Sequence, residues 1–213
     1  MSNTVAVISL KGGTGKTSLS IGAAAALSTP RRRVILIDSD PQGSATRWAE
    51  GGGLPFPVHA LDASRGATHY RRDLEALSEG ADLVLIDCPP EDGEPSNLAA
   101  LVADLVLIPA TPSALDLWAA GKAVQMAREA RENRKGKLPL VSLIPSKLIA
   151  RTRLAAELPG ALKALGETVG PSIGQRVAVA EASVTGKPVA PSSPAGQELE
   201  ELARHILNRL RRA

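Results

Sequence analysis

The sequence predicts an α/β fold in which a doubly wound, mostly parallel sheet is flanked by helices. Three observations support this prediction. Short apolar runs of five or six residues recur along the chain, segments with helical spacing separate them, and a glycine-rich turn follows the first run. A chain of 213 residues suits one such domain, so we expect residues 1–213 to form a single domain.

Five segments are predicted as buried strands, at residues 5–10, 33–38, 83–87, 105–109 and 140–145. Helices are expected at 16–28, 68–79, 113–133 and 153–166, where Ala and Leu alternate with charged residues. Residues 51–57 and 186–196 are rich in Gly, Pro or Ser and are expected to be surface loops. Residues 197–212 predict a terminal amphipathic helix, with one apolar face formed by Leu199, Leu202, Ile206 and Leu210.

Composition excludes several classes of protein. Cys88 is the only cysteine, so an internal disulfide and a metal centre built from several thiolates of one chain are excluded. We expect Cys88 to be a small buried hydrophobic side chain. No apolar run approaches the length that crosses a bilayer and the first residues carry no basic region, which predicts a cytoplasmic protein. Aromatic residues are only 2%, so any nucleic-acid contact should go to phosphates rather than stacked bases.

A glycine-rich turn joins the first predicted strand to the first predicted helix, in the stretch KGGTGKTS at 11–18. Glycines allow backbone N–H groups to converge on phosphate oxygens, and the following helix N-terminus favours negative charge. Lys16 can then reach the β and γ phosphates, and the Thr17 hydroxyl can bind Mg²⁺. An ordinary turn with solvated lysines is the alternative. We favour a nucleotide site because strand, turn, lysines, threonine and helix all agree.

The stretch KGGTGKT departs from the ordinary Walker A pattern, because Leu10 stands where that pattern has glycine and Lys11 precedes the paired glycines. It resembles the deviant Walker A signature of the ParA/MinD family of P-loop NTPases. VILIDSDPQGSAT at 34–46, LVLIDCPP at 83–90 and ADLVLIPATPSALDL at 103–117 match the same family in order and spacing. The resemblance covers essentially the whole chain and is greatest to the small ParA-type branch, which lacks an N-terminal DNA-binding extension.

This resemblance implies a Mg²⁺-dependent ATPase whose ATP form is a homodimer with ATP between the subunits. Lys11 would reach the ATP of the partner subunit, Lys16 would bind the phosphates of its own, and Asp40 would orient the attacking water. Asp38 and Asp87 would join Thr17 around Mg²⁺; the alternatives are acidic residues that cap the next helix or pair with a surface base. The implied ATP contacts are Lys11, Gly12, Gly13, Thr14, Gly15, Lys16, Thr17 and Ser18, with Pro145 as a candidate beside the adenine.

The ParA branch binds DNA without sequence preference, and this implies a nucleoid-associated protein that moves a cargo with the help of a ParB-like adaptor. Basic side chains doubled by dimerisation would bind backbone phosphates more tightly. The candidates are Lys147, Arg151, Arg153, Arg176 and Lys187. Ordinary solvated side chains are the alternative, and residues 128–137, where Glu interrupts the basic run, are interpreted as a solvated helix end.

Two other functions are compatible with the same scaffold. A MinD-like regulator would lie on a membrane through the terminal helix, but the apolar face of that helix lacks Phe and Trp and its polar face carries Glu198, Glu200 and Glu201. The second possible function is that of a metabolic or assembly ATPase, such as a ligase or an iron–sulfur scaffold protein. An iron–sulfur scaffold protein needs paired cysteines, which this sequence does not have. We expect neither.

Overall fold

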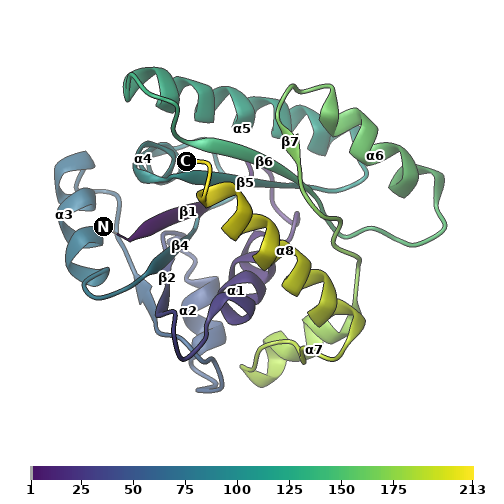
Figure 1. Cartoon of the computed structure of the whole chain (residues 1–213), viewed down its shortest axis with the longest axis horizontal. Helices are drawn as coiled ribbons and strands as arrows, with labels where there is room; N and C mark the ends of the chain where they lie inside the picture. The colour runs from purple at the N-terminus through teal and green to yellow at the C-terminus, as the bar shows by residue number, and fades with distance from the viewer. Residues whose placement is uncertain (1) are drawn as a thin grey trace.

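A single sheet of seven parallel strands forms the centre of the molecule, in the order β3-β2-β4-β1-β5-β6-β7 (Figure 1). The computed structural model describes residues 2–213, so Met1, the first residue of the predicted domain, lies outside the described part. The predicted doubly wound parallel fold is confirmed. The strands are β1 (Asn3–Val7), β2 (Val34–Asp38), β3 (Val58–Ala60), β4 (Leu83–Asp87), β5 (Leu105–Ala110), β6 (Leu140–Pro145) and β7 (Thr168–Val169).

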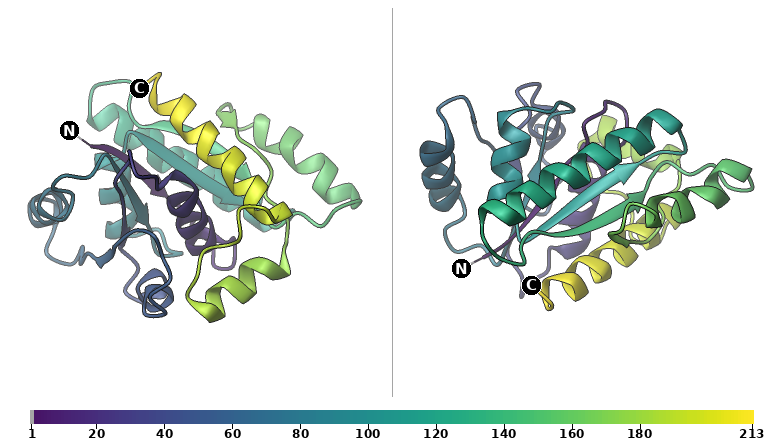
Figure 2. Two further views of the ribbon diagram at one scale, coloured as in Figure 1. Left: turned by 60° about the horizontal axis from the view of Figure 1, so that its bottom comes forward. Right: turned by 90° about the horizontal axis from the view of Figure 1, so that it is seen from above.

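Helices cover both faces of the sheet. One buried cluster joins the sheet to α3 (Ala67–Leu77), α4 (Glu94–Val102), α5 (Ala114–Asn133) and α6 (Arg153–Lys163). The other joins it to α1 (Lys16–Leu27), α2 (Ser44–Ala49), α7 (Val177–Thr185) and α8 (Pro194–Leu210). Figure 2 shows α8 running beside α1, and the two helices contact each other on the same face of the sheet.

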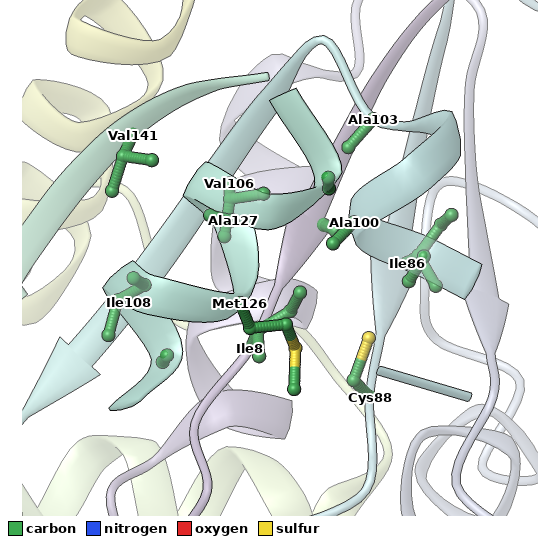
Figure 3. Close-up of a cluster of buried hydrophobic side chains, with 14 of the residues drawn as sticks. Ile8, Ile86, Cys88, Ala100, Ala103, Val106, Ile108, Met126, Ala127 and Val141 are labelled. Carbon is green, nitrogen blue, oxygen red and sulfur yellow. The ribbon is translucent and has the colours of Figure 1, made fainter. Parts of the chain in front are cut away.

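Alternation along the strands explains why the central runs are apolar throughout. Successive side chains of a strand point to opposite faces, and here each face is covered by helices. In β2, Ile35 and Ile37 enter the cluster with α3 and α4, whereas Val34 and Leu36 enter the cluster with α1 and α8. Cys88 is fully buried among such side chains, as predicted (Figure 3).

The structure differs from the predicted elements at the edges of the sheet and near the C-terminus. Four elements were not predicted from the sequence. They are the strands β3 and β7, of three and two residues, and the helices α4 and α7, of nine residues each. Such short elements contain too few turns or alternations to give a clear period. Helix α8 begins at Pro194, inside a predicted loop, because the Ser193 side chain caps it by accepting a hydrogen bond from the Gly196 N–H at 3.0 Å.

Candidate nucleotide site

The predicted phosphate loop connects the carboxyl end of the central strand β1 to α1. Gly13 and Gly15 have φ of +81° and +91°, in the region that favours glycine. No atom lies within 4 Å of the position a Cβ would occupy at Gly12 or Gly13, so the loop borders an open space. Gly15 caps α1 without a side-chain hydrogen bond, which leaves the first N–H groups of that helix for an anion.

Two side chains of this loop fit a phosphate ligand. Lys16 is 7% exposed, and its Nζ donates only a long hydrogen bond of 3.4 Å to the Lys11 carbonyl. Burial lowers the pKa of Lys16, while Asp87, Cys88 and Asp40 act in the opposite direction. Thr14 is buried, and within residues 2–213 its Oγ1 has no hydrogen-bond partner. A phosphate oxygen would supply the partner that both groups need.

Asp87 is fully buried at the end of β4. Its two oxygens accept hydrogen bonds from Thr17 Oγ1 at 2.7 Å and Ser20 Oγ at 2.9 Å. Burial raises the pKa of Asp87 to about 7, although both hydroxyls lower it, and the nearby Asp38 adds to the rise. Ser20 was not predicted from the sequence, and its only signal there is its place one helical turn after Lys16. A buried carboxyl with two hydroxyl donors and a neighbouring acid is suited to bind a cation.

Asp38 is the last residue of β2, and Asp40 lies two residues further on; we call residues 38–43 the aspartate loop. Asp38 is 2% exposed, and its Oδ2 accepts hydrogen bonds from the Thr46 N–H at 2.8 Å and the Thr46 hydroxyl at 2.9 Å. Thr46 belongs to the first turn of α2, so this contact is the helix-capping role that the sequence left open. Asp40 is half-buried, and its Oδ1 accepts a hydrogen bond from the Gln42 N–H at 2.9 Å.

The sheet brings the predicted Mg²⁺ ligands to one place. Asp38 and Asp87 are register partners on the neighbouring strands β2 and β4, and Thr17 contacts Asp87 from α1. No cluster of three or more His, Cys, Asp or Glu residues that could hold a metal occurs among the described residues. Mg²⁺ commonly uses one or two carboxylates and completes its shell with waters and substrate phosphates, so this set fits it. The individual roles remain predictions.

Lys11 lies outside the cradle formed by its own loop. Its Nζ is 2.6 Å from Oδ1 of Asp116, at the start of α5, and the Lys11 side chain is 38% exposed. Asp116 is 4% exposed, and its Oδ2 accepts a hydrogen bond from the Thr111 hydroxyl. Asp116 was not predicted, because it lies more than a hundred positions along the chain from Lys11. Within this subunit, the signature lysine is therefore held by a buried carboxylate.

A cavity of about 340 Å³ lies beside the phosphate loop, between β6, α7 and α8. Its walls include Gly15, Ser18, Ser146, Lys147, Arg176 and Glu198. Pro145 does not line it; the carbonyl of Pro145 accepts a hydrogen bond from the Ile173 N–H at 2.8 Å, and the two residues that follow Pro145 face the cavity. A larger open groove of about 1360 Å³ lies at the amino end of the sheet and contains none of the predicted site residues.

The structure places the five predicted DNA contacts in three different locations. Lys147 and Arg176 line the cavity beside the phosphate loop, Arg151 and Arg153 lie at the start of α6, and Lys187 follows α7. Two of the five carry a nearby acid: Arg153 pairs with Glu157 and Arg176 with Glu198, both at 2.6 Å. Arg151 and Lys187 are exposed. The ion pairs weaken the case for Arg153 and Arg176 as phosphate contacts.

A parallel sheet with a glycine cradle, a buried lysine and paired strand-end carboxylates defines a P-loop nucleotide-binding protein. The chain belongs to the CobQ/CobB/MinD/ParA nucleotide binding domain family, whose model matches residues 5–189. The predicted family membership is thereby confirmed, and the chain is a ParA/MinD-family ATPase.

Two curated relatives illustrate a match along nearly the full length of both chains. The chain is 32% identical over 208 residues to the maintenance of carboxysome distribution protein A of Halothiobacillus neapolitanus, covering 96% of this chain and 94% of the relative. It is 32% identical over 241 residues to the chromosome-partitioning ATPase Soj of Thermus thermophilus, covering 98% and 97%.

Solved structures share the fold. Apo McdA of Cyanothece superposes with a TM-score of 0.83 at 21% identity, covering 97% of this chain and all of that one. MinD of Aquifex aeolicus gives a TM-score of 0.79 at 17% identity, covering 97% of each. Among residues 2–213, none of the helices has both the length and the apolar character needed to cross a membrane.

Proposed function

We propose that this protein is a ParA-type ATPase that dimerises on ATP, binds DNA without sequence preference and positions a cargo. Hydrolysis stimulated by a partner protein would reset the cycle. The observation that carries the proposal is the phosphate loop with a second lysine, Lys11, which lies outside the cradle of its own subunit and pairs with Asp116. A lysine so placed is available to the ATP of a second copy.

The surface around Lys11 supports a protein interface. Leu115 and Trp118, on either side of Asp116 at the start of α5, are 58% and 68% exposed. Exposed large apolar side chains beside a ligand site are typical of a surface that a partner covers, and Trp is enriched in such surfaces. On dimerisation Lys11 would exchange Asp116 for the phosphates of the facing ATP, which carry more negative charge. ATP would thus favour the dimer.

Hydrolysis would take place at the carboxyl edge of the sheet. Lys16 would bind the β and γ phosphates, and the half-buried Asp40 would orient the attacking water. Mg²⁺, held by Thr17 with Asp38 and Asp87, would neutralise charge that develops on the phosphates. The cavity lined by Ser146 and Lys147 is of a size to take the nucleoside, and this makes them better candidates for nucleoside contacts than Pro145.

The relatives support a cargo-positioning role. Two curated relatives matched over nearly their full length are named for the distribution of carboxysomes and for chromosome partitioning, and MinD of Aquifex aeolicus has been solved as a complex with MinC. We propose that this chain likewise acts with a partner, a ParB-like adaptor. Lys147, Arg151 and Lys187 are exposed and have no ion-pair partner among the described residues; because Lys147 lines the cavity proposed for the nucleoside, Arg151 and Lys187 are the strongest candidates for nucleoid DNA.

The test is retention of the purified protein on non-specific double-stranded DNA with ATP or ADP and Mg²⁺. We expect ATP-dependent retention for the parent and none for Lys16→Ala, which loses its phosphate contact. Lys11→Ala should bind ATP but not dimerise, whereas Asp40→Ala should dimerise, retain DNA and hydrolyse ATP slowly. Retention that is equal with ATP and ADP, or Asp40→Ala hydrolysing at the parental rate, would contradict the proposal.

Fewer structural features support the two alternative functions, a regulator on a membrane surface and a metabolic ATPase. A membrane role would need the apolar face of α8, but Leu199, Leu202 and Ile206 are buried against α1 and the sheet. Sedimentation with liposomes in the presence of ATP, without DNA retention, would favour that role. Phosphate release that requires a small acceptor molecule and no protein partner would favour a metabolic ATPase.

A further inference from the structure

The aspartate loop is attached to the sheet through the residue between its two acids. The Ser39 N–H donates a hydrogen bond of 2.9 Å to the Asp87 carbonyl, which extends the β2–β4 pairing by one residue. Because side chains alternate along an extended segment, Ser39 faces the side occupied by Ile35 and Ile37, opposite to Asp38. Ser39 is 3% exposed, and its side chain points to the face of the sheet opposite to that of Asp38.

Tyr70 meets Ser39 from α3. The two hydroxyl oxygens are 3.0 Å apart, and Tyr70, the only tyrosine of the chain, is 1% exposed. A longer contact of 3.5 Å joins the Ser39 hydroxyl to the Leu61 carbonyl, and the Leu61 N–H donates to the Asp38 carbonyl at 2.9 Å. The segment that leads from β3 into α3 therefore holds the aspartate loop from the face opposite the Asp38 side chain.

Most other hydrogen bonds of the loop are local. The N–H groups of Asp40 and Gln42 donate to Asp38 Oδ1 and Asp40 Oδ1, and the Gly43 N–H donates to the Asp40 carbonyl. These bonds shape the turn, and Thr46 holds the Asp38 side chain from α2, whereas Ser39 attaches the loop to β4 and α3. Burial raises the pKa of Tyr70 far above its ordinary value, so the phenol stays neutral and keeps its proton for a hydrogen bond.

We propose that Tyr70 is a positioning residue for ATP hydrolysis, which acts through Ser39 to fix the backbone that carries Asp38 and Asp40. The inference rests on the proposed ATPase function. Tyr70 touches no reacting group; its hydroxyl restricts where the water-orienting carboxylate can lie. Small displacements of positioned groups cost rate rather than ground-state binding, so the effect belongs in kcat. A buried pair of hydroxyls that served packing alone would leave kcat unchanged.

The experiment compares Tyr70→Phe, which keeps the ring and removes the hydroxyl, with the parent in steady-state ATP hydrolysis. One hydrogen bond supports an effect of up to roughly tenfold, so we expect kcat to fall by about three- to tenfold while the KM for ATP stays within about twofold. Ser39→Ala should have the same effect. Because both changes break one contact, the double variant should be no slower than either single variant.

Ser142→Ala is the matched control, since it removes another buried hydroxyl contact, of 2.9 Å to His205, outside the aspartate loop. Denaturant unfolding of all variants shows whether any loss of kcat accompanies a loss of fold. The inference is overturned if Tyr70→Phe keeps the parental kcat, if Ser142→Ala lowers kcat as much, or if the two single effects multiply. A parent that hydrolyses no ATP would instead overturn the proposed function, and the inference with it.

Discussion

At the scale of single residues, the pair between Lys11 and Asp116 is the contact most relevant to the proposed cycle. Asp116 is buried, so its charge needs a partner, whereas Lys11 has part of its side chain in solvent. The pair stabilises the subunit in which it forms. Lys11 would leave Asp116 on dimerisation. The free energy that the ion pair contributes to each subunit therefore opposes formation of the dimer.

Replacing the buried acid should therefore favour dimerisation. We expect Asp116→Asn to lower the concentration for half-maximal ATP-dependent dimerisation by about ten- to hundredfold, because two ion pairs of roughly 1 kcal/mol each break when one homodimer forms. Sedimentation velocity over a protein titration measures this. Glu157→Gln is the control, because it breaks the exposed pair with Arg153 and should not shift the midpoint. Weaker dimerisation of Asp116→Asn would show that Asp116 assists the dimer.

The sequence predicted the residues of the site that belong to contiguous motifs, and not those that reach it from elsewhere. Lys16 and Thr17 were identified from the glycine pattern around them. Ser20 and Tyr70 were not, because their partners Asp87 and Ser39 lie 67 and 31 positions away and only the folded sheet joins them. A serine in an Ala-rich helix and a tyrosine in an Arg-rich helix have no local feature that indicates such a role.

At the scale of elements, long strands and helices were predicted well and their ends less so. The three central apolar runs alternate between two covered faces, so their composition alone indicates buried strands. Helix α7 lacks that kind of signal, since Val177 and Val184 are 75% and 87% exposed and its apolar residues have no helical period. Helix α8 begins at Pro194 and is capped by Ser193. Serine and proline also favour loops, so the sequence pattern did not show where this helix starts.

Two helical glycines should respond in opposite ways to alanine. A Cβ at Gly196, in the first turn of α8, would lie 2.2 Å from the Ala190 carbonyl oxygen, whereas at Gly160 in α6 it would meet nothing within 4 Å. We expect Gly196→Ala to lower the free energy of unfolding by about 1–3 kcal/mol through overpacking. Gly160→Ala should raise it by about 0.5–1 kcal/mol through helix propensity. Denaturant midpoints measure both, and equal signs would contradict the expectation.

At the scale of the whole molecule, α8 closes the fold by burying its apolar face against α1 and the sheet. The same helix carries His205, whose ring contacts the Ser142 hydroxyl at 2.9 Å. Burial lowers the pKa of His205, and the nearby Arg209 lowers it further. On acidification the unfolded chain therefore takes up this proton before the folded one does. The stability that this difference provides at neutral pH is lost as the pH falls below about 6.5.

The expected outcome is a contribution of His205 to the pH dependence of stability that a variant removes. Between pH 7.5 and pH 5.5, the raised pKa of Asp87 stabilises the folded chain on acidification in the parent and in His205→Gln alike. Against that shared change, the urea midpoint of His205→Gln should move upward relative to the parent as the pH falls, because the glutamine side chain does not titrate. His69→Gln, on the surface helix α3, should follow the parent. A slope for His205→Gln equal to that of the parent would assign the acid sensitivity to other groups.

The two tryptophans occupy contrasting environments, and this gives the protein a label-free optical report. Trp48 is 8% exposed on α2, where its indole N–H donates to the Lys187 carbonyl at 3.2 Å, and Trp118 is 68% exposed on α5, two residues after Asp116. An enclosed indole emits at shorter wavelength than one in water and resists quenching by iodide. Fluorescence emission from the unmodified chain can thus distinguish a change of environment at the start of α5 from one at α2. It needs no dye or fusion partner that could disturb either surface.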